Sequence, residues 1–168
     1  MVAKPENWPN SFIDESQPRS SWPYLVLTSP FAARCAIEVA KQNNDLKRIQ
    51  WLAIGEGTAR ACFLRGVTVS ICAKARDSKE LFNYIQENID RTTKLMIPRS
   101  NVAKETLVKS LEEQDFIVES WVGYENKTKV VSKIDVDSDD VLLLSSPSSA
   151  RAWAENSLPI PRSILCML

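Results

Sequence analysis

The chain has 168 residues, of which 44% are hydrophobic and 25% are charged, values that are ordinary for a globular protein. Its 21 basic and 21 acidic residues cancel, so the net charge gives no general attraction to nucleic acid or to a membrane, and any anion site must be local. Histidine is absent, which excludes Ser-His and Cys-His catalysis and the usual zinc sites.

Targeting signals and reactive cysteines are not evident either. No apolar run approaches the roughly 20 residues that span a bilayer, and the N-terminus lacks the apolar core of a signal peptide. The four cysteines lie in apolar stretches without C-x-x-C spacing, which favours reduced, buried thiols. We therefore expect a cytoplasmic protein that holds no metal and has no nucleic-acid or membrane partner.

Residues 1–22 are expected to form an extended tail or linker. Prolines at positions 5, 9 and 18 block helix propagation and cannot donate to a central strand. Trp8 and Phe12 either pack on a neighbouring surface or remain exposed to solvent.

Strands and helices are predicted to alternate over residues 23–124. Apolar runs predict strands, and amphipathic or capped segments predict helices. The expected strands are 24–27, 49–54, 67–71, 94–97 and 116–122, and the expected helices are 30–42, 58–65, 78–88 and 102–114. Gly66 is predicted to close the second helix, and Ser78 to cap the third. This alternation predicts one complete α/β domain with a flavodoxin-like, doubly wound parallel sheet.

The start of the first strand-helix unit is repeated near the end of the chain. Residues 28–34 read T-S-P-x-A-x-R, and the serine, proline and arginine of this pattern recur 117 positions later as Ser146, Pro147 and Arg151. A repeat of this length predicts duplication of a domain. We expect a linker over 125–140 and the beginning of a second, related α/β domain over 141–168, whose uncovered strands favour self-association.

Three loops are candidates for ligand binding because they follow strands and lead into helices. They are 28–30, 55–58 and 99–101, and each combines the positive end of a helix with a hydroxyl group or a cation. Such loops can bind phosphate or carboxylate. The alternative is structural: hydroxyls cap helices, glycines permit turns, and Arg99 is solvated. Residues 55–58 lack the third glycine of a dinucleotide site and a P-loop lysine, which argues against those sites.

Tyr124 follows the last strand of the complete domain. Its phenol either faces a cleft between domains or anchors the chain with the hydroxyl directed outward.

The order of these motifs resembles the uroporphyrinogen-III synthase family. The motifs are T-S-P-x-A-x-R at 28–34, A-I-G-x-x-T-A at 53–59, L-x-I-P-R-S at 95–100, V-x-x-x-x-x-Y-E at 118–125 and L-x-S-S-P-S-x-A-R at 143–151. The resemblance covers residues 24–168. It implies two flavodoxin-like domains that face each other across a cleft. It also predicts a shortened or fragmentary member, in which the family's opening and closing segments have no counterpart.

The resemblance also implies a reaction. Family members cyclise hydroxymethylbilane, a linear tetrapyrrole with many carboxylates, by loss of water and inversion of the terminal pyrrole ring, without metal or cofactor. Tyr124 is then the catalytic candidate that helps the hydroxyl group leave. The implied substrate-binding residues are Thr28, Ser29, Gly55, Thr58, Arg99 and Ser100 on one side, and Ser146 and Ser148 on the other.

Two other functions remain open from the sequence. One is a catalytically silent remnant or interaction module of this family. The other is a flavodoxin-like domain that binds an anion or nucleotide at residues 28–29 and would carry flavin colour.

Overall fold

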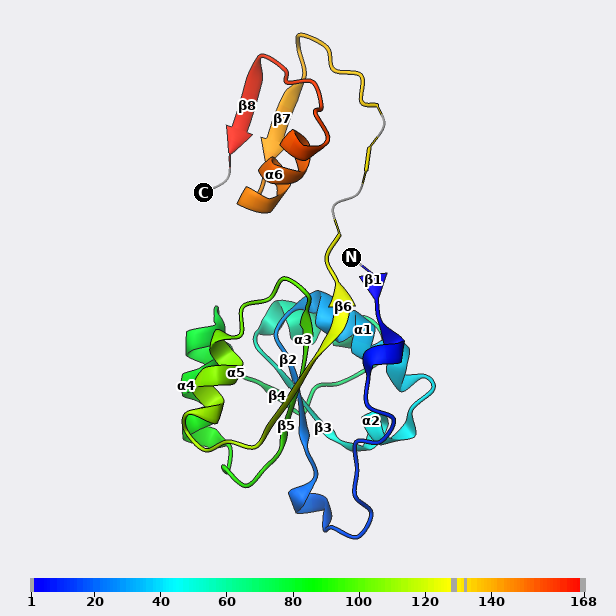
Figure 1. Ribbon diagram of the computed structural model, residues 1–168, viewed down its shortest axis with the longest axis vertical. Helices are drawn as coiled ribbons and strands as arrows, with labels where there is room; N and C mark the ends of the chain where they lie inside the picture. Colours follow the sequence, from blue (N-terminus) through cyan, green and yellow to red (C-terminus); the bar gives the residue numbers. More distant parts are fainter. Residues whose placement is uncertain (1, 128–129, 132, 167–168) are drawn as a thin grey trace. The chain divides into compact units, whose positions relative to one another are not determined.

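The computed structural model describes residues 2–127, 130–131 and 133–166. The chain divides into two compact units, Met1–Asn126 and Lys127–Leu168 (Figure 1). Each unit is described by itself below.

Unit 1 is built on a six-stranded sheet. Its strands are β1 (Val2–Ala3), β2 (Tyr24–Leu27), β3 (Gln50–Ala53), β4 (Ile71–Cys72), β5 (Leu95–Ser100) and β6 (Val118–Glu125). They lie in the order β1-β6-β5-β2-β3-β4. Only β1 is antiparallel, and the other five strands are parallel.

This arrangement confirms the predicted doubly wound parallel sheet. Numbered among the parallel strands alone, the order is 3-2-1-4-5, so the winding direction reverses between β2 and β5. Flavodoxin itself has the order 2-1-3-4-5. The reversal therefore comes one strand later here than in flavodoxin, a difference that depends on chain path and leaves no mark in the hydrophobic pattern.

Helices cover both faces of the sheet (Figure 1). The first group is α1 (Pro30–Ala40), α2 (Asn44–Arg48) and α3 (Glu56–Phe63), and the second is α4 (Ser78–Asn88) and α5 (Thr106–Glu112). Leu25 and Leu27 of β2 face the cluster that contains α1 and α3 residues, whereas Val26 faces the cluster of α4 and α5. All three side chains are fully buried, which explains the unbroken apolar run of this strand.

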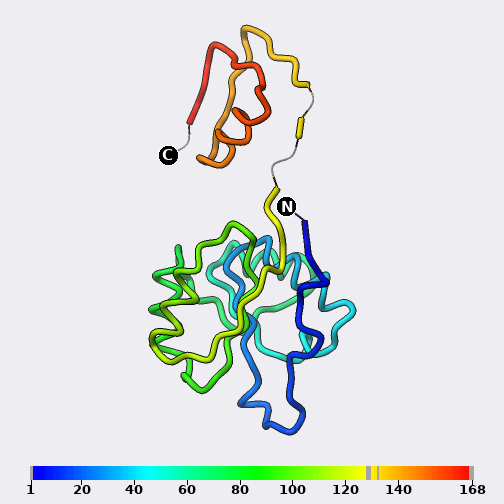
Figure 2. The backbone as a smooth tube through the Cα atoms, viewed as in Figure 1, coloured from blue at the N-terminus to red at the C-terminus, as the bar shows by residue number. Residues whose placement is uncertain are grey.

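The N-terminal segment corrects the prediction of a tail. β1 pairs with β6, and Trp8 and Phe12 are only 5% and 6% exposed. The Trp8 indole donates to the Gly123 carbonyl over 3.1 Å and packs edge-on against Trp121. Short 3₁₀ turns at Pro5–Asn7 and Arg19–Ser21 interrupt the N-terminal segment. Figure 2 traces the backbone of this segment from its pairing with β6, past α2, to β2. Irregularly spaced aromatic residues hold this segment, so it has no periodicity to detect.

Other boundaries differ from the predictions for local reasons. Asp77, not Ser78, is the N-cap of α4, because its Oδ1 accepts from the backbone N–H groups of Lys79 and Glu80, each over 2.9 Å. Gly66, predicted to close the second helix directly, lies two residues after its C-cap, Leu64, and has a left-handed conformation with φ of 77°. The strand predicted over 67–71 is observed as β4, which covers only Ile71–Cys72.

Unit 2 contains β7 (Val141–Leu144), α6 (Pro147–Glu155) and β8 (Ser163–Cys166). The two strands are parallel. β7 and the start of α6 lie 117 positions after β2 and the start of α1, as the repeat predicts. The predicted linker has no helix or strand in its described residues after Glu125.

No helix in the described part of the chain is both long and apolar enough to cross a membrane.

Candidate functional site at the carboxyl edge of the sheet

Most of the predicted site residues lie along one edge of the unit 1 sheet. Because β2, β3, β5 and β6 are parallel, their carboxyl ends meet at this edge. Following the strand order, it presents Tyr124, then Arg99 and Ser100, then the 28–29 turn, and finally Gly55. The reversal of winding between β5 and β2 places a topological switch point at its centre, where ligands of such folds bind.

Ser29 and Tyr124 form a hydrogen-bonded pair at this edge. Ser29 is the N-cap of α1, and its Oγ accepts from the Ala32 N–H over 3.0 Å. The Tyr124 hydroxyl lies 3.1 Å from the same Oγ. Since that Oγ already accepts the N–H of the helix, the pair orients the phenol relative to the helix N-terminus.

The environment keeps the Tyr124 phenol protonated. Its side chain is 6% exposed, and the ring lies 5.1 Å from that of Phe31. Burial raises the pKa of Tyr124 above its ordinary value, and this outweighs the opposing hydrogen bond from Ser29. At neutral pH the group is therefore a hydrogen-bond donor with no charge.

A cavity of about 500 Å³ opens at the switch point, on the α4 and α5 side of the sheet. Thr28 and Arg99 both line it. Lys79, in the first turn of α4, and Lys104, just before α5, add two cations, against one carboxylate from Asp77. Arg99 donates to Glu105 over 2.9 Å. The cavity is thus suited to carboxylate or phosphate groups.

Sequence reasoning missed these two lysines. Lys79 belongs to a helix that was placed correctly, so its position at the positive helix end was a usable signal. Lys104 gave no such signal, because α5 was expected to begin at residue 102, whereas it begins at Thr106, after Lys104.

Gly55, Thr58 and Ser100 are held within the fold. A Cβ on Gly55 would lie 2.9 Å from the Ala75 carbonyl oxygen, so glycine permits this close approach. Thr58 is 2% exposed and Ser100 is 8% exposed. Gly57, by contrast, borders open space, with no atom within 4 Å of a Cβ there. In the first turn of α3 the backbone at Gly57 is therefore exposed, whereas the Thr58 side chain is buried.

In unit 2, Ser146 and Ser148 lie at the N-terminus of α6. Ser146 has φ −167° and ψ 158°, close to the −160° and 157° of Ser29. Its Oγ accepts from the Ser149 N–H over 3.2 Å, and the Ser149 Oγ accepts from the Ser146 N–H over 3.1 Å. Ser148 is exposed, 3.0 Å from Ser146 between their Oγ atoms. The sequence repeat therefore corresponds to a repeated helix start.

Comparison with protein families decides the affiliation. The model of the family described as uroporphyrinogen-III synthase HemD matches residues 4–163, nearly the whole chain. The chain belongs to the uroporphyrinogen-III synthase family. This family is one of cyclising hydro-lyases in tetrapyrrole (heme) biosynthesis, and the match confirms the resemblance seen in the motifs. It also includes most of the N-terminal segment, which the motifs did not cover.

Two solved structures share the fold. Uroporphyrinogen-III synthetase from Helicobacter pylori 26695 has a TM-score of 0.63 at 19% identity, over 93% of this chain and 72% of that one. A mutant uroporphyrinogen III synthase from the extremely thermophilic bacterium Thermus thermophilus has a TM-score of 0.53 at 14% identity, over 88% of this chain and 64% of that one. A search of curated proteins gave no match.

Proposed function

We propose that this chain binds hydroxymethylbilane at the carboxyl edge of unit 1 and catalyses its closure to uroporphyrinogen III. The observation that carries the assignment of the site is the Ser29–Tyr124 pair, a buried neutral phenol held at a helix N-terminus. Family membership supports the reaction.

The proposed role of Tyr124 follows from its protonation state. The reaction breaks the bond between the terminal methylene carbon and its hydroxyl oxygen, and the bonding electrons leave with the oxygen. The pyrrole nitrogen supplies electrons to the methylene carbon, and the proton that its N–H then releases converts the departing hydroxide to water. A phenol with a raised pKa is a weak acid but a competent hydrogen-bond donor. We assign Tyr124 to polarise this bond by donating to the departing oxygen, while Ser29 fixes the direction of the phenol.

Binding of the substrate carboxylates is assigned to the switch-point cavity. Arg99, Lys79 and Lys104 provide positive charge there, and Thr28 provides a hydroxyl. Gly55, Thr58 and Ser100 support the loops. Ser146 and the exposed Ser148 provide a second group of hydroxyls at a helix N-terminus in unit 2. No cofactor is needed for these roles.

Self-association belongs to the same proposal. Every second residue of β7 and all four residues of β8 are exposed, including Val141 at 54%, Leu143 at 58% and Leu165 at 60%. Apolar surface of this kind favours contact with a second copy. Sedimentation velocity over a range of concentrations tests it, and Leu143→Lys should shift the distribution toward monomer. The cytoplasmic location remains a prediction.

The function is tested by supplying enzymatically generated hydroxymethylbilane and separating the oxidised type I and type III uroporphyrins. We expect type III product above the spontaneous type I background. Type I alone, from folded protein, would favour a silent family member. A bound yellow flavin would favour the alternative of a flavodoxin-like domain that binds an anion or nucleotide.

A further inference from the structure

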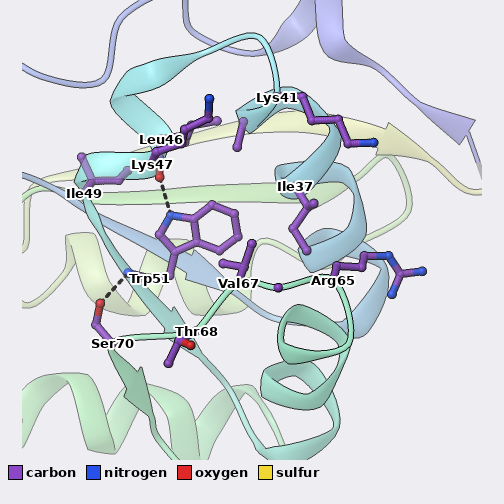
Figure 3. Close-up of a pocket in the computed structure, with 12 residues that line it drawn as sticks. Ile37, Lys41, Leu46, Lys47, Ile49, Trp51, Arg65, Val67, Thr68 and Ser70 are labelled. Atoms are coloured by element: carbon purple, nitrogen blue, oxygen red, sulfur yellow. Dashed lines mark hydrogen bonds between the residues drawn. The ribbon is translucent and has the colours of Figure 1, made fainter.

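A second cavity lies at the opposite edge of the unit 1 sheet, where β3 and β4 begin. Its volume is about 470 Å³, within the range of small-molecule sites. Its walls come from the end of α1, from α2, from the start of β3 and from the 65–70 connection (Figure 3). It contains none of the residues assigned to the carboxyl edge, so it is independent of the proposed function.

The floor of this cavity is apolar and fixed in place. Figure 3 shows the Trp51 indole at its centre, with Ile37 and Val67 beside the ring. The indole N–H donates to the Leu46 carbonyl over 2.7 Å, and the Trp51 backbone N–H donates to Ser70 Oγ over 3.3 Å. The apolar surface is therefore formed before any ligand binds.

The rim is positively charged. Lys41, Lys47 and Arg65 line the cavity, and none of the lining residues, all within the described part of the chain, is acidic. Lys41 and Arg65 extend on the same side of the pocket in Figure 3.

Each of these cations has donors beyond those already used. Lys41 Nζ lies 2.7 Å from Glu38, Lys47 Nζ donates to Asn44 over 3.1 Å, and one Arg65 N–H donates to the Ala61 carbonyl over 3.2 Å. A lysine ammonium has three N–H donors and a guanidinium has five. The rim can therefore bind an anionic group while its internal contacts remain.

We propose that this cavity binds an amphipathic organic anion, a ring system that carries a carboxylate or sulfonate group. The ring packs on the floor formed around Trp51, and the acidic group lies among Lys41, Lys47 and Arg65. Charge complementarity favours an anion, because the lining has three cations and no carboxylate, and the Glu38 carboxylate that pairs with Lys41 does not line the cavity.

The probe for this site is 8-anilinonaphthalene-1-sulfonate, titrated into the ¹⁵N-labelled full chain. We expect saturable shifts at the amides of Gly66, Thr68 and Ser70 and at the Trp51 indole. The chain has only four glycines, so the Gly66 signal is simple to follow. Because the exposed apolar residues of β7 and β8 offer an alternative site, shifts confined to Val141–Cys166, or no shifts, would overturn the proposal.

Charge variants test the role of the rim. Lys47→Gln and Arg65→Gln should each weaken binding of the probe about two- to five-fold, as expected for exposed charge pairs. Thr68→Glu, which adds a negative charge to an exposed lining position, should weaken it further. Lys109→Gln is the matched control, because Lys109 is exposed on α5 and outside this cavity.

A neutral ring of the same size completes the test. N-phenyl-1-naphthylamine lacks the sulfonate, so its weaker binding should not change in the rim variants. Equal affinity for both rings, or equal loss in Lys109→Gln and Lys47→Gln, would overturn the proposal.

Discussion

At the scale of single residues, two neighbouring glycines at the start of α3 have opposite constraints. Gly55 faces the Ala75 carbonyl oxygen at 2.9 Å from the position of a Cβ, whereas Gly57 faces open space within α3. Gly55→Ala should therefore lower the free energy of unfolding by about 1–3 kcal/mol through crowding. Gly57→Ala should raise it by about 0.4–1 kcal/mol, because alanine restricts the unfolded chain and favours helix.

Urea denaturation of the two variants beside the parent chain measures this difference. Equal stabilities for Gly55→Ala and Gly57→Ala would contradict the close approach to Ala75. The sequence showed a glycine-rich turn at 55–58 but not this distinction, because the crowding comes from a carbonyl twenty residues away.

At the scale of elements, the N-cap of α4 makes the clearest prediction. Asp77 accepts two backbone N–H groups at the start of the helix, and its charge favours the positive helix end. Asp77→Ala should cost about 1 kcal/mol of stability, whereas Ser78→Ala, one position on, should cost little. Thermal unfolding followed by circular dichroism compares them. A larger loss of stability in Ser78→Ala than in Asp77→Ala would instead support Ser78 as the N-cap, as predicted from the sequence.

Elements with strong local signals were predicted well. Strand Tyr24–Leu27 and helix Ser78–Asn88 have the expected bounds, because a continuous apolar run and a capped amphipathic segment specify them locally. The five-residue helix α2 was missed because it is too short for periodicity. Lys79 and Lys104, which line the cavity with Thr28 and Arg99, were missed for another reason. The order of winding brings α4 and α5 to the carboxyl edge of the sheet, and the sequence does not encode that order locally.

At the scale of the whole molecule, unit 1 contains both buried clusters. A fragment of residues 1–126 should therefore unfold cooperatively, at nearly the same urea concentration as the matching transition of the full chain. A fragment of residues 14–126 should lose most of this stability, because it lacks the buried Trp8 and Phe12; removing a buried Trp or Phe side chain alone costs about 3–5 kcal/mol. Equal midpoints for the two fragments would contradict a structural role for the N-terminal segment.

The carboxyl edge of the unit 1 sheet brings together residues that are far apart in the sequence. Parallel strands bring Tyr124 and Ser29, 95 positions apart in sequence, into hydrogen-bond contact. The motif order predicts that both belong to the proposed site, and the parallel sheet explains why they lie in contact.

The most direct test of this account is a double-mutant cycle on that pair, with the rate of type III uroporphyrin formation as the readout. Tyr124→Phe removes only the hydroxyl, and Ser29→Ala removes its partner. We expect Tyr124→Phe to slow type III formation about ten-fold or more, Ser29→Ala to slow it less, and the double variant to resemble Tyr124→Phe. An undiminished rate in folded Tyr124→Phe would contradict the assignment of this edge as the catalytic site.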